Sequence, residues 1–376
     1  MTIDFRCNTY IETDMAQLKQ NISNIRSHIG ENMDVIAVLK GNAYGMGLIE
    51  IGKFVTEHCG IKTIACAHTF EAVQLIEAGV KSKYFVMGGV PFNNIKDVVA
   101  NNIETSAFSK EYLELLNEEA KAQNKAANVH IKIETGLNRI GVLIGKDLDD
   151  LCELLKSLTN LRVNGIYTHF ADAENTDKTF THNQFDKFKK ALAQVKKYNF
   201  DFEYVHAFNT AGASLLKDSE MTHIRVAGLL FGFDTNPNPE VRIDLKEVLS
   251  WRCFVTNVKT IETGETVGYS RYFKAERPTK VATISAGYGD GYNRILGMKG
   301  ADAIVNGKRA KLIGICMDQA FLDVTDIEDV KINDQVTLMG HDGDEYISVF
   351  ELGNVMEQTY LATIATISGR VKRVYR

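Results

Sequence analysis

The chain has 376 residues, 45% of them hydrophobic and 24% charged, which is long enough for two domains with a large core. The net charge is −5 with no basic block, and no run of about 18 apolar residues occurs, so neither nucleic acid nor a membrane is an expected partner. The N-terminus is too polar for a signal peptide, and six cysteines without CxxC spacing predict reduced thiols in a cytoplasmic protein rather than disulfides or a zinc site.

The first 240 residues alternate between predicted strands and predicted helices. Short apolar runs predict strands at 34–39, 63–67, 83–87, 104–107, 129–133, 162–168, 202–206 and 223–226. Apolar residues at helical spacing predict helices at 9–30, 48–58, 69–78, 94–101, 110–123, 148–158, 183–198 and 212–216. About eight alternations predict an α/β fold, a (β/α)8 TIM-type barrel.

The pattern changes after residue 236, where short β-branched segments are separated by turns such as Asn306-Gly307. Strands are predicted at 248–262, 279–285, 303–305, 311–313, 321–324 and 335–339, with one possible helix at 349–359. The predicted domains are therefore a barrel over 1–239 and a mostly β domain over 240–376. Residues 1–10 and the first helix are open to either domain.

The stretch 37–47, AVLKGNAYGMG, contains an apolar run that stops at Lys40 and continues into a loop rich in Gly and Asn. This pattern predicts a buried strand with a lysine at its C-terminal end. The pKa of a lysine amine falls readily when the amine is buried, and a lysine that forms a Schiff base needs such a lowered pKa. A lysine that reaches out to solvent is the equally weighted alternative.

Four other polar residues also lie at or just beyond the C-terminal ends of predicted strands, namely Arg139, His169, Asn209 and Arg225. In a (β/α)8 barrel the C-terminal ends of the strands form the active-site face. The agreement of these positions with Lys40 predicts one site at that end.

Ordered motifs then identify a family. The motif around Lys40 is followed by ETGLNRIG, IYTHFA, HAFNTAG, IRVAGLLFG, VGYSRYF, SAGYGDGY, GICMDQ and TISGRV. Together they resemble alanine racemases of the fold-type III pyridoxal-phosphate class, along the whole chain. The resemblance implies an N-terminal barrel with a C-terminal β domain, which is also what the pattern predicts.

The resemblance implies a racemase that uses two bases. Lys40 corresponds to the Schiff-base lysine, and Tyr269 corresponds to the second base, which enters the site from the other subunit of a homodimer. One acid–base group on each face of the substrate is what racemisation needs. The family places a histidine, here His169, in the network of the tyrosine. Without the motifs, Tyr269 would be interpreted as an aromatic residue of a strand core.

The resemblance also implies pyridoxal 5'-phosphate as cofactor. Arg225 corresponds to the arginine that faces the pyridine nitrogen, and an arginine leaves that nitrogen unprotonated because it keeps its own proton. The implied cofactor-binding residues are Lys40, Tyr44, Arg139, His169, Asn209, Thr210, Arg225 and the backbone N–H groups near Ala227 and Gly228.

The implied substrate contacts are Arg139, which also holds the cofactor phenolate, and the backbone N–H of Met317, which comes from the other subunit. Cys316 and Asp318 support Tyr269 and the cofactor side. Lys132 falls where some relatives carry a carbamylated lysine, and an ordinary lysine paired with an acid is the alternative. Weaker matches to the substrate entrance are Asp172 or Glu174, Tyr288 and Arg294.

The main departure from the family pattern is Gly369, where a tyrosine usually borders the substrate side chain and reaches the phosphate. Its loss predicts a larger pocket, so that serine or larger amino acids are candidates beside alanine. The physiological route, either D-alanine for peptidoglycan or another D-amino acid, stays open.

Three alternatives remain. A fold-type III decarboxylase would have an acidic partner for the ring nitrogen, and a non-catalytic pyridoxal-phosphate protein would lack the second domain. A metal-dependent hydrolase would use His169, His206 and His223, which lack paired carboxylates at ligand spacing.

Overall fold

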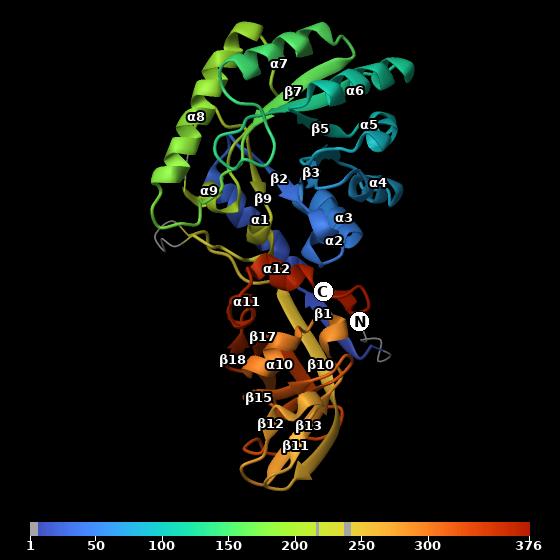
Figure 1. Ribbon diagram of the computed structural model, residues 1–376, viewed down its shortest axis with the longest axis vertical. Coiled ribbons are helices and arrows are strands. Elements are labelled where there is room, and N and C mark those ends of the chain that lie inside the picture. Colours follow the sequence, from blue (N-terminus) through green and yellow to red (C-terminus); the bar gives the residue numbers. More distant parts are fainter. Residues whose placement is uncertain (1–6, 216–217, 237–241) are drawn as a thin grey trace. The chain divides into compact units, whose positions relative to one another are not determined.

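Parallel strands alternate with helices from residue 34 to residue 226 in the computed structural model (Figure 1). The structure describes residues 7–215, 218–236 and 242–376. These residues form two units, which we call the barrel unit (17–43 and the described part of 48–246) and the β unit (7–16, 44–47 and 247–376).

The barrel unit contains one parallel sheet of eight strands, in the order β8-β7-β6-β5-β4-β3-β2-β9. The strands are β2 (Asp34–Val38), β3 (Thr63–Cys66), β4 (Lys83–Val86), β5 (Glu104–Ala107), β6 (Ala127–Lys132), β7 (Leu161–Tyr167), β8 (Tyr204–His206) and β9 (His223–Val226). Backbone hydrogen bonds from Thr222 to Val205 (2.9 Å) and from Arg225 to Phe208 (3.0 Å) join the two ends of the sheet. The predicted (β/α)8 barrel is therefore confirmed.

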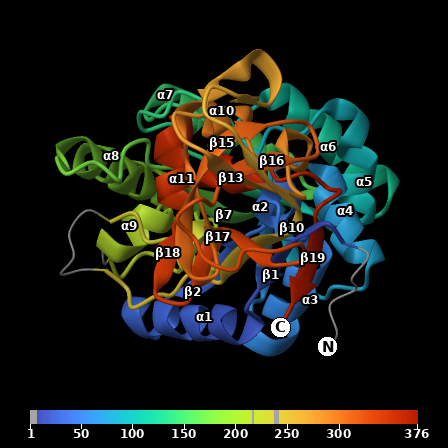
Figure 2. The ribbon, with the colours of Figure 1, turned by 90° about the horizontal axis from the view of Figure 1, so that it is seen from below.

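Helices alternate with the strands, and all except α2 lie around the periphery of this unit (Figure 2). They are α1 (Met15–Ile29), α2 (Lys40–Tyr44), α3 (Leu48–Cys59), α4 (Thr69–Glu77), α5 (Ile95–Ala100), α6 (Lys110–Ala122), α7 (Lys146–Ser157), α8 (Thr179–Val195) and α9 (Thr210–Leu215), with 3-10 turns η1 (Phe92–Asn94), η2 (Lys196–Tyr198) and η3 (Gly228–Phe231). In α6 the side chains of Leu113 and Leu116 are buried, and Ser109 caps the helix. None of the helices in the described ranges is long and apolar enough to cross a membrane.

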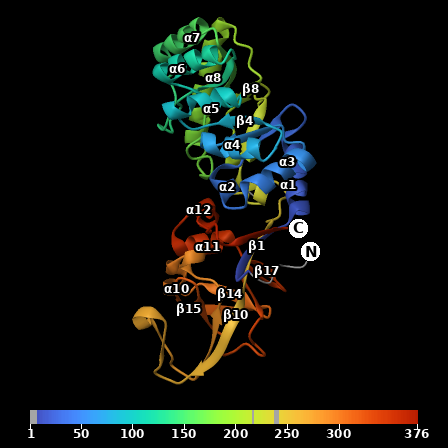
Figure 3. The same ribbon diagram turned by 90° about the vertical axis from the view of Figure 1, so that its right-hand side faces the viewer.

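The β unit contains a sheet of nine strands, in the order β18-β17-β14-β15-β16-β13-β10-β1-β19. Figure 3 labels β1, β10, β14, β15 and β17 of this sheet. The strands are β1 (Thr9–Thr13), β10 (Leu249–Ile261), β13 (Thr279–Ile284), β14 (Asp302–Val305), β15 (Lys308–Ile315), β16 (Ala320–Asp323), β17 (Gln335–Asp342), β18 (Glu345–Ile347) and β19 (Lys372–Tyr375). Because β17 also pairs with β10, part of this sheet closes into a ring. The remaining elements are the hairpin β11 (Thr266–Val267) and β12 (Phe273–Lys274), the helices α10 (Arg294–Lys299), α11 (Val349–Met356) and α12 (Tyr360–Ala365), and the turns η5 (Tyr269–Arg271) and η6 (Tyr288–Asp290).

The helix predicted over 9–30 was wrong at its start. Residues 9–13 form β1, which pairs with β10 and β19, and Trp251 Nε1 donates to Thr9 Oγ1 at 2.9 Å. Strand pairing with a segment about 240 residues away outweighs the local helical pattern. Helix α8 begins at Thr179 rather than at residue 183, and α9 begins at Thr210, whereas Leu216 of the helix predicted over 212–216 lies outside the described residues. The hairpin β11–β12, the strands β18 and β19 and the helix α10 were not predicted.

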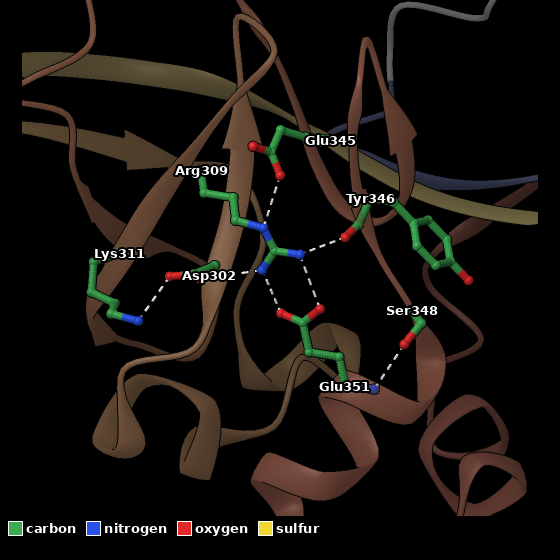
Figure 4. Close-up of polar contacts among 7 residues, drawn as sticks. All are labelled: Asp302, Arg309, Lys311, Glu345, Tyr346, Ser348 and Glu351. Atoms are coloured by element: carbon green, nitrogen blue, oxygen red, sulfur yellow. Dashed lines mark hydrogen bonds and ion pairs between the residues drawn. The ribbon is translucent and has the colours of Figure 1, made fainter.

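A partly exposed ion cluster links β14, β15, β18 and α11 within the β unit (Figure 4). The guanidinium of Arg309 donates to both carboxylate oxygens of Glu351, at 2.6 and 3.1 Å. It also donates to Glu345 at 3.0 Å and to Asp302 at 3.2 Å. Ser348 caps α11 by accepting from the backbone N–H of Glu351 at 3.0 Å. One side chain therefore ties a helix start to three strands.

Candidate active site

Lys40 lies directly after β2, where the backbone turns left-handed. The strand is buried and apolar up to Leu39, and then Gly41, Asn42 and Ala43 have φ values of 63°, 56° and 53°. A left-handed turn costs about 1–2 kcal/mol per residue other than glycine, so other contacts must hold it. Glu71 accepts from the backbone N–H of Gly41 at 2.5 Å, and Asn42 Oδ1 accepts from Leu48 N–H at 2.8 Å.

Burial lowers the pKa of Lys40, and the nearby charge of Arg139 lowers it further, whereas Glu71 acts in the opposite direction. The carboxylate of Glu71 is buried and also accepts from the backbone N–H groups of Ala67 (2.9 Å) and His68 (3.1 Å). The amine of Lys40 is therefore more readily neutral, and hence nucleophilic, than an exposed lysine.

Arg225, on β9, is only 2% exposed and donates in several directions. Its Nη1 donates to Nδ1 (2.8 Å) and O (3.0 Å) of His206, and its Nη2 donates to Thr168 O (2.8 Å), Ala207 O (3.2 Å) and His169 Nδ1 (3.1 Å). The Nε atom is buried and has no partner among the described residues. Burial lowers the pKa of Arg225 to about 10, so the guanidinium stays charged at neutral pH and offers one free donor.

His169 is neutral in this arrangement. A guanidinium has no acceptor, so Nδ1 of His169 must accept from Arg225 and the ring proton must lie on Nε2. Burial holds the pKa of His169 well below its usual range, and the charges of Arg225, Arg139, Lys132 and Lys40 add to that effect. Arg225 contacts the imidazole directly, and the other three basic side chains act on it electrostatically.

Lys132, at the end of β6, is 1% exposed and donates to Ile133 O at 2.7 Å. Burial lowers the pKa of Lys132 to about 7, with Glu134 opposing the shift and Arg225 and Arg139 reinforcing it. About half of the amine is therefore neutral near pH 7. One carboxylate oxygen of Glu134, Oε2, is buried and has no partner among the described residues.

The predicted phosphate-binding residues follow β8 and β9. Asn209 Oδ1 accepts from the backbone N–H of Gly212 at 3.1 Å and so orders the first turn of α9. The backbone N–H of Ala227 donates to Thr210 Oγ1 at 3.3 Å, which brings these two segments together beside Gly228. Hydroxyl and main-chain donors thus gather at the end of the barrel where Arg225 lies.

The β unit holds a second group of predicted residues. The side chain of Tyr269 is 76% exposed, and its backbone hydrogen-bonds the thiol of Cys316, whose pKa is raised by burial and partly restored by that bond. The backbone of residues 316–317 is held in turn, because Tyr288 N–H donates to Cys316 O (3.0 Å) and Gly289 N–H donates to Met317 O (2.8 Å). Tyr269 and Met317 are therefore fixed through their main chains while their side chains remain exposed.

Arg370 anchors the end of this group, with Nη2 at 2.8 Å from Asp318 and Nε at 2.7 Å from Asp290. Gly369 precedes it on the surface, and a Cβ built there would meet no atom within 4 Å. Tyr269, Tyr288 and Arg294 line one cavity of about 390 Å³ in the β unit.

The structure thus brings the predicted residues together in two groups. The barrel unit holds Lys40, Lys132, Arg139, His169, Asn209, Thr210, Arg225, Ala227 and Gly228. The β unit holds Tyr44, which is buried, and Tyr269, Cys316, Met317, Asp318 and Gly369. Asp172 is exposed, and Glu174 accepts a hydrogen bond from Thr235 at 2.8 Å.

Sequence reasoning missed Glu71, Glu134, His130 and Glu104, and considered His206 only as a metal ligand. The available signal was polar residues at alternate positions of buried strands, such as His130 and Lys132 in β6. No group of three or more potential ligands that could hold a metal ion occurs among the residues the structure describes.

Comparison with known proteins also divides the chain into an N-terminal and a C-terminal part. A family model described as alanine racemase, N-terminal domain, matches residues 13–235, and one described as alanine racemase, C-terminal domain, matches residues 248–375. An alanine racemase from Methanococcus maripaludis is 34% identical over 368 residues, which cover 97% of this chain and 98% of that protein. A solved alanine racemase from Clostridium difficile 630 has a TM-score of 0.93 at 26% identity and covers 100% of this chain and 97% of its own. One from Bartonella henselae, with covalently bound pyridoxal phosphate, has a TM-score of 0.87 at 25% identity, with coverages of 98% and 99%.

Proposed function

The chain belongs to the alanine racemase family, and from this we propose that it is an isomerase that interconverts L- and D-alanine with pyridoxal phosphate as cofactor. The observation that carries the proposal is the buried guanidinium of Arg225, which has one unpartnered N–H, in the cluster that contains Lys40. The decarboxylase alternative is not favoured, because the ring-nitrogen position carries an arginine and the relatives are named alanine racemases.

The residues at this end of the barrel fit pyridoxal phosphate. Arg225 Nε supplies a donor for the ring nitrogen, and a guanidinium that keeps its proton leaves that nitrogen unprotonated. Thr210 and the neighbouring main chain suit a phosphate dianion. The proposed cofactor-binding residues, besides Lys40 and Arg225, are Tyr44, Arg139, His169, Asn209, Thr210, Ala227 and Gly228.

Racemisation requires an acid–base group on each face of the substrate α-carbon. Pyridoxal phosphate, when bound, withdraws electrons from that carbon and so acidifies its C–H bond. On one face Lys40 Nζ takes or returns the proton, which its lowered pKa favours. On the other face the phenol of Tyr269 does so, and His169, which burial and Arg225 keep neutral, belongs to its hydrogen-bond network.

Arg139 holds the substrate carboxylate, and the backbone N–H of Met317 from the other subunit is a second donor. Lys132 supports Arg139 as a neutral amine, because an ammonium beside a guanidinium would repel it. The position is also suited to a carbamate, since a neutral amine is the form that adds CO2. Cys316 supports the backbone of Tyr269, and Asp318 pairs with Arg370, which donates to Met317 O at 3.4 Å.

The substrate range extends beyond alanine in this proposal. Gly369 is exposed and leaves open space where a side chain would project, so the pocket gains room for serine or larger side chains. Rates on L-Ala, L-Ser, L-Lys and L-Arg test the point. Strict preference for alanine would contradict it.

The active unit in this proposal is a cytoplasmic homodimer. Tyr269 is 76% exposed and Met317 is exposed too, so both are accessible to a second copy of the chain. A mixture of a Lys40→Ala variant with a Tyr269→Phe variant should regain activity through hybrid dimers. Failure to regain activity while subunits exchange would refute the shared site.

The purified protein, loaded with pyridoxal phosphate, tests the main proposal by chiral analysis of L-alanine turnover. Lys40→Ala should abolish D-alanine formation and the visible absorbance of the lysine-bound cofactor. Lys62→Ala is the matched control, because Lys62 is 81% exposed and pairs with Asp34 at 3.3 Å on the barrel exterior. Release of CO2 without inversion would instead identify a decarboxylase.

A further inference from the structure

Four buried side chains form a continuous hydrogen-bonded chain across the barrel interior. Arg225 Nη1 donates to His206 Nδ1 at 2.8 Å, and His206 Nε2 lies 3.1 Å from His130 Nδ1. His130 Nε2 lies 2.6 Å from Glu104 Oε2. The chain crosses from β9 through β8 and β6 to β5. It links the cationic cluster to a carboxylate that none of the proposed catalytic steps uses.

The two ends of this chain dictate one direction for every bond in it. Arg225 can only donate, so His206 Nδ1 accepts and His206 carries its proton on Nε2. That proton leaves His130 Nδ1 as an acceptor, so His130 carries its own proton on Nε2 and donates to Glu104. Both imidazoles are therefore neutral, and a carboxylate, which can only accept, is the matching end.

Neighbouring side chains hold the rings of His130 and His206 in the orientation that these hydrogen bonds require. Phe85 stacks on His130 with ring centroids 4.2 Å apart, and Tyr167 stacks on His206 at 4.9 Å. A Cβ on Gly165 would lie 2.7 Å from His130 Nδ1, so only glycine leaves room for the ring. Neither ring can turn over without displacing a neighbour.

Glu104 is 4% exposed and accepts a second hydrogen bond from Asn164 at 3.0 Å. Burial raises the pKa of Glu104, but hydrogen bonds from His130 and Asn164 and the charge of Lys83 leave that pKa below its usual value. The carboxylate lines a cavity of about 730 Å³ at the N-terminal ends of the strands, opposite the proposed active site. Lys83 and Glu203, which pair there, belong to the same cavity.

We propose that Glu104 and His130 are positioning residues, which act through His206 to hold Arg225 with its Nε donor free for the cofactor ring nitrogen. The inference rests on the proposed function for the role of Arg225. If Glu104 cannot accept, the His130 Nε2–H is buried without a partner, and this cost favours the other tautomer of the ring against the direction that Arg225 imposes. A reversed His206 would then present an N–H to Arg225, and the two donors would repel each other.

The first test is the imidazole 15N NMR spectrum of histidine-labelled, cofactor-free protein, which reports the protonated nitrogen of each ring. His130 and His206 should both be protonated on Nε2 alone. Glu104→Leu should give a mixed or Nδ1-protonated His206, and Glu104→Gln, which keeps an acceptor oxygen, should restore the wild-type pattern. An unchanged His206 in Glu104→Leu would overturn the proposal.

The second test is the affinity of the cofactor-free protein for pyridoxal phosphate, from the absorbance change on titration. Glu104→Leu should raise the Kd at least tenfold, and Glu203→Leu, in the same cavity but outside the chain, should change it less than twofold. Equal effects would reduce Glu104 to a structural role and overturn the proposal. If Glu104→Leu does not fold, Gly165→Ala replaces it, because the added methyl group displaces His130. This variant should give the same mixed tautomers, and a wild-type NMR pattern in it would refute the proposal. Wild-type protein that fails to bind the cofactor would contradict the proposed function but leave the tautomer result standing.

Discussion

Lys132→Met is expected to change how the stability of the protein depends on pH. Burial lowers the pKa of Lys132 from 10.5 to about 7 in the folded chain, whereas the unfolded chain keeps the ordinary value. Between these two values the unfolded state binds more protons, so the free energy of unfolding rises with pH. Below pH 7 both states are protonated, and the cost of the buried ammonium is fully present.

The size of the effect follows from the two pKa values. A shift from 10.5 to about 7 corresponds to about 5 kcal/mol, at 1.36 kcal/mol for each unit. Between pH 7 and pH 9 the folded amine releases its remaining proton while the unfolded amine keeps almost all of its own. This difference makes the wild type gain about 2 kcal/mol from Lys132 over that range, and the Met variant lacks this gain.

Urea unfolding of the cofactor-free protein from pH 6 to pH 9 measures the difference. Far-UV circular dichroism is the suitable signal, because the single tryptophan, Trp251, belongs to the β unit. Lys125→Met is the matched control. Lys125 is half-buried in the loop between α6 and β6, and its amine donates to Val99 O (3.1 Å) and Ala100 O (2.6 Å). Parallel pH curves for wild type and Lys132→Met would refute the reasoning. A wild-type curve that shifts with added bicarbonate would instead identify a carbamate on Lys132.

Three further substitutions test the β unit and the pocket. Gly287→Ala should destabilise the β unit by about 2 kcal/mol or more, because its Cβ would lie 2.4 Å from Met317 O, and tryptophan fluorescence during urea unfolding measures this. Arg309→Met should lower the stability of the same unit by about 1–2 kcal/mol, because Glu351 loses its bidentate partner while the cluster stays partly solvated (Figure 4). Gly369→Tyr should fold normally and raise the ratio of alanine to serine racemisation, because the new ring has open space but narrows the pocket.

Each of these has a clear contrary result. Gly307→Ala, in a turn with no atom within 4 Å, controls for the general effect of adding a methyl group, although its φ of 67° adds local strain. Equal stability of Gly287→Ala and wild type would show that the 316–317 backbone yields easily. An Arg309→Met protein as stable as wild type would mean that solvent screening cancels the cluster. An unchanged substrate ratio in Gly369→Tyr would remove residue 369 from the pocket.

Most of the fold could be predicted from the sequence because the barrel is built from local alternation. Most strands of the barrel contain a short apolar run, and the longer helices have an amphipathic pattern, so neighbouring residues carry the signal. β1 could not be predicted, because its partners β10 and β19 lie at the other end of the chain. The same reason explains the absence of β19 from the predicted elements. β18 pairs locally with β17, but it has only three residues, which is too short for a strand pattern.

The residues of the candidate site also include some that could be predicted from local sequence and some that could not. Lys40 and Arg225 were found because a polar residue at the end of a barrel strand is a local pattern with a known location. Glu71 and Glu104 were missed because each acts on groups from other segments, Glu71 on the backbone after β2 and Glu104 on a histidine of β6. Nothing in their immediate sequence distinguishes them from ordinary acids.

The sequence by itself determined the α/β barrel, the β domain after it and the lysine around which the site is organised. Only the tertiary structure decided the state of the site: the near-neutral pKa of Lys132, the free donor of Arg225 and the single direction of the chain to Glu104. Loss of solvent and the pairing of donors with acceptors set these properties, and both depend on distances between residues of different strands. Such distances exist only once the barrel has closed.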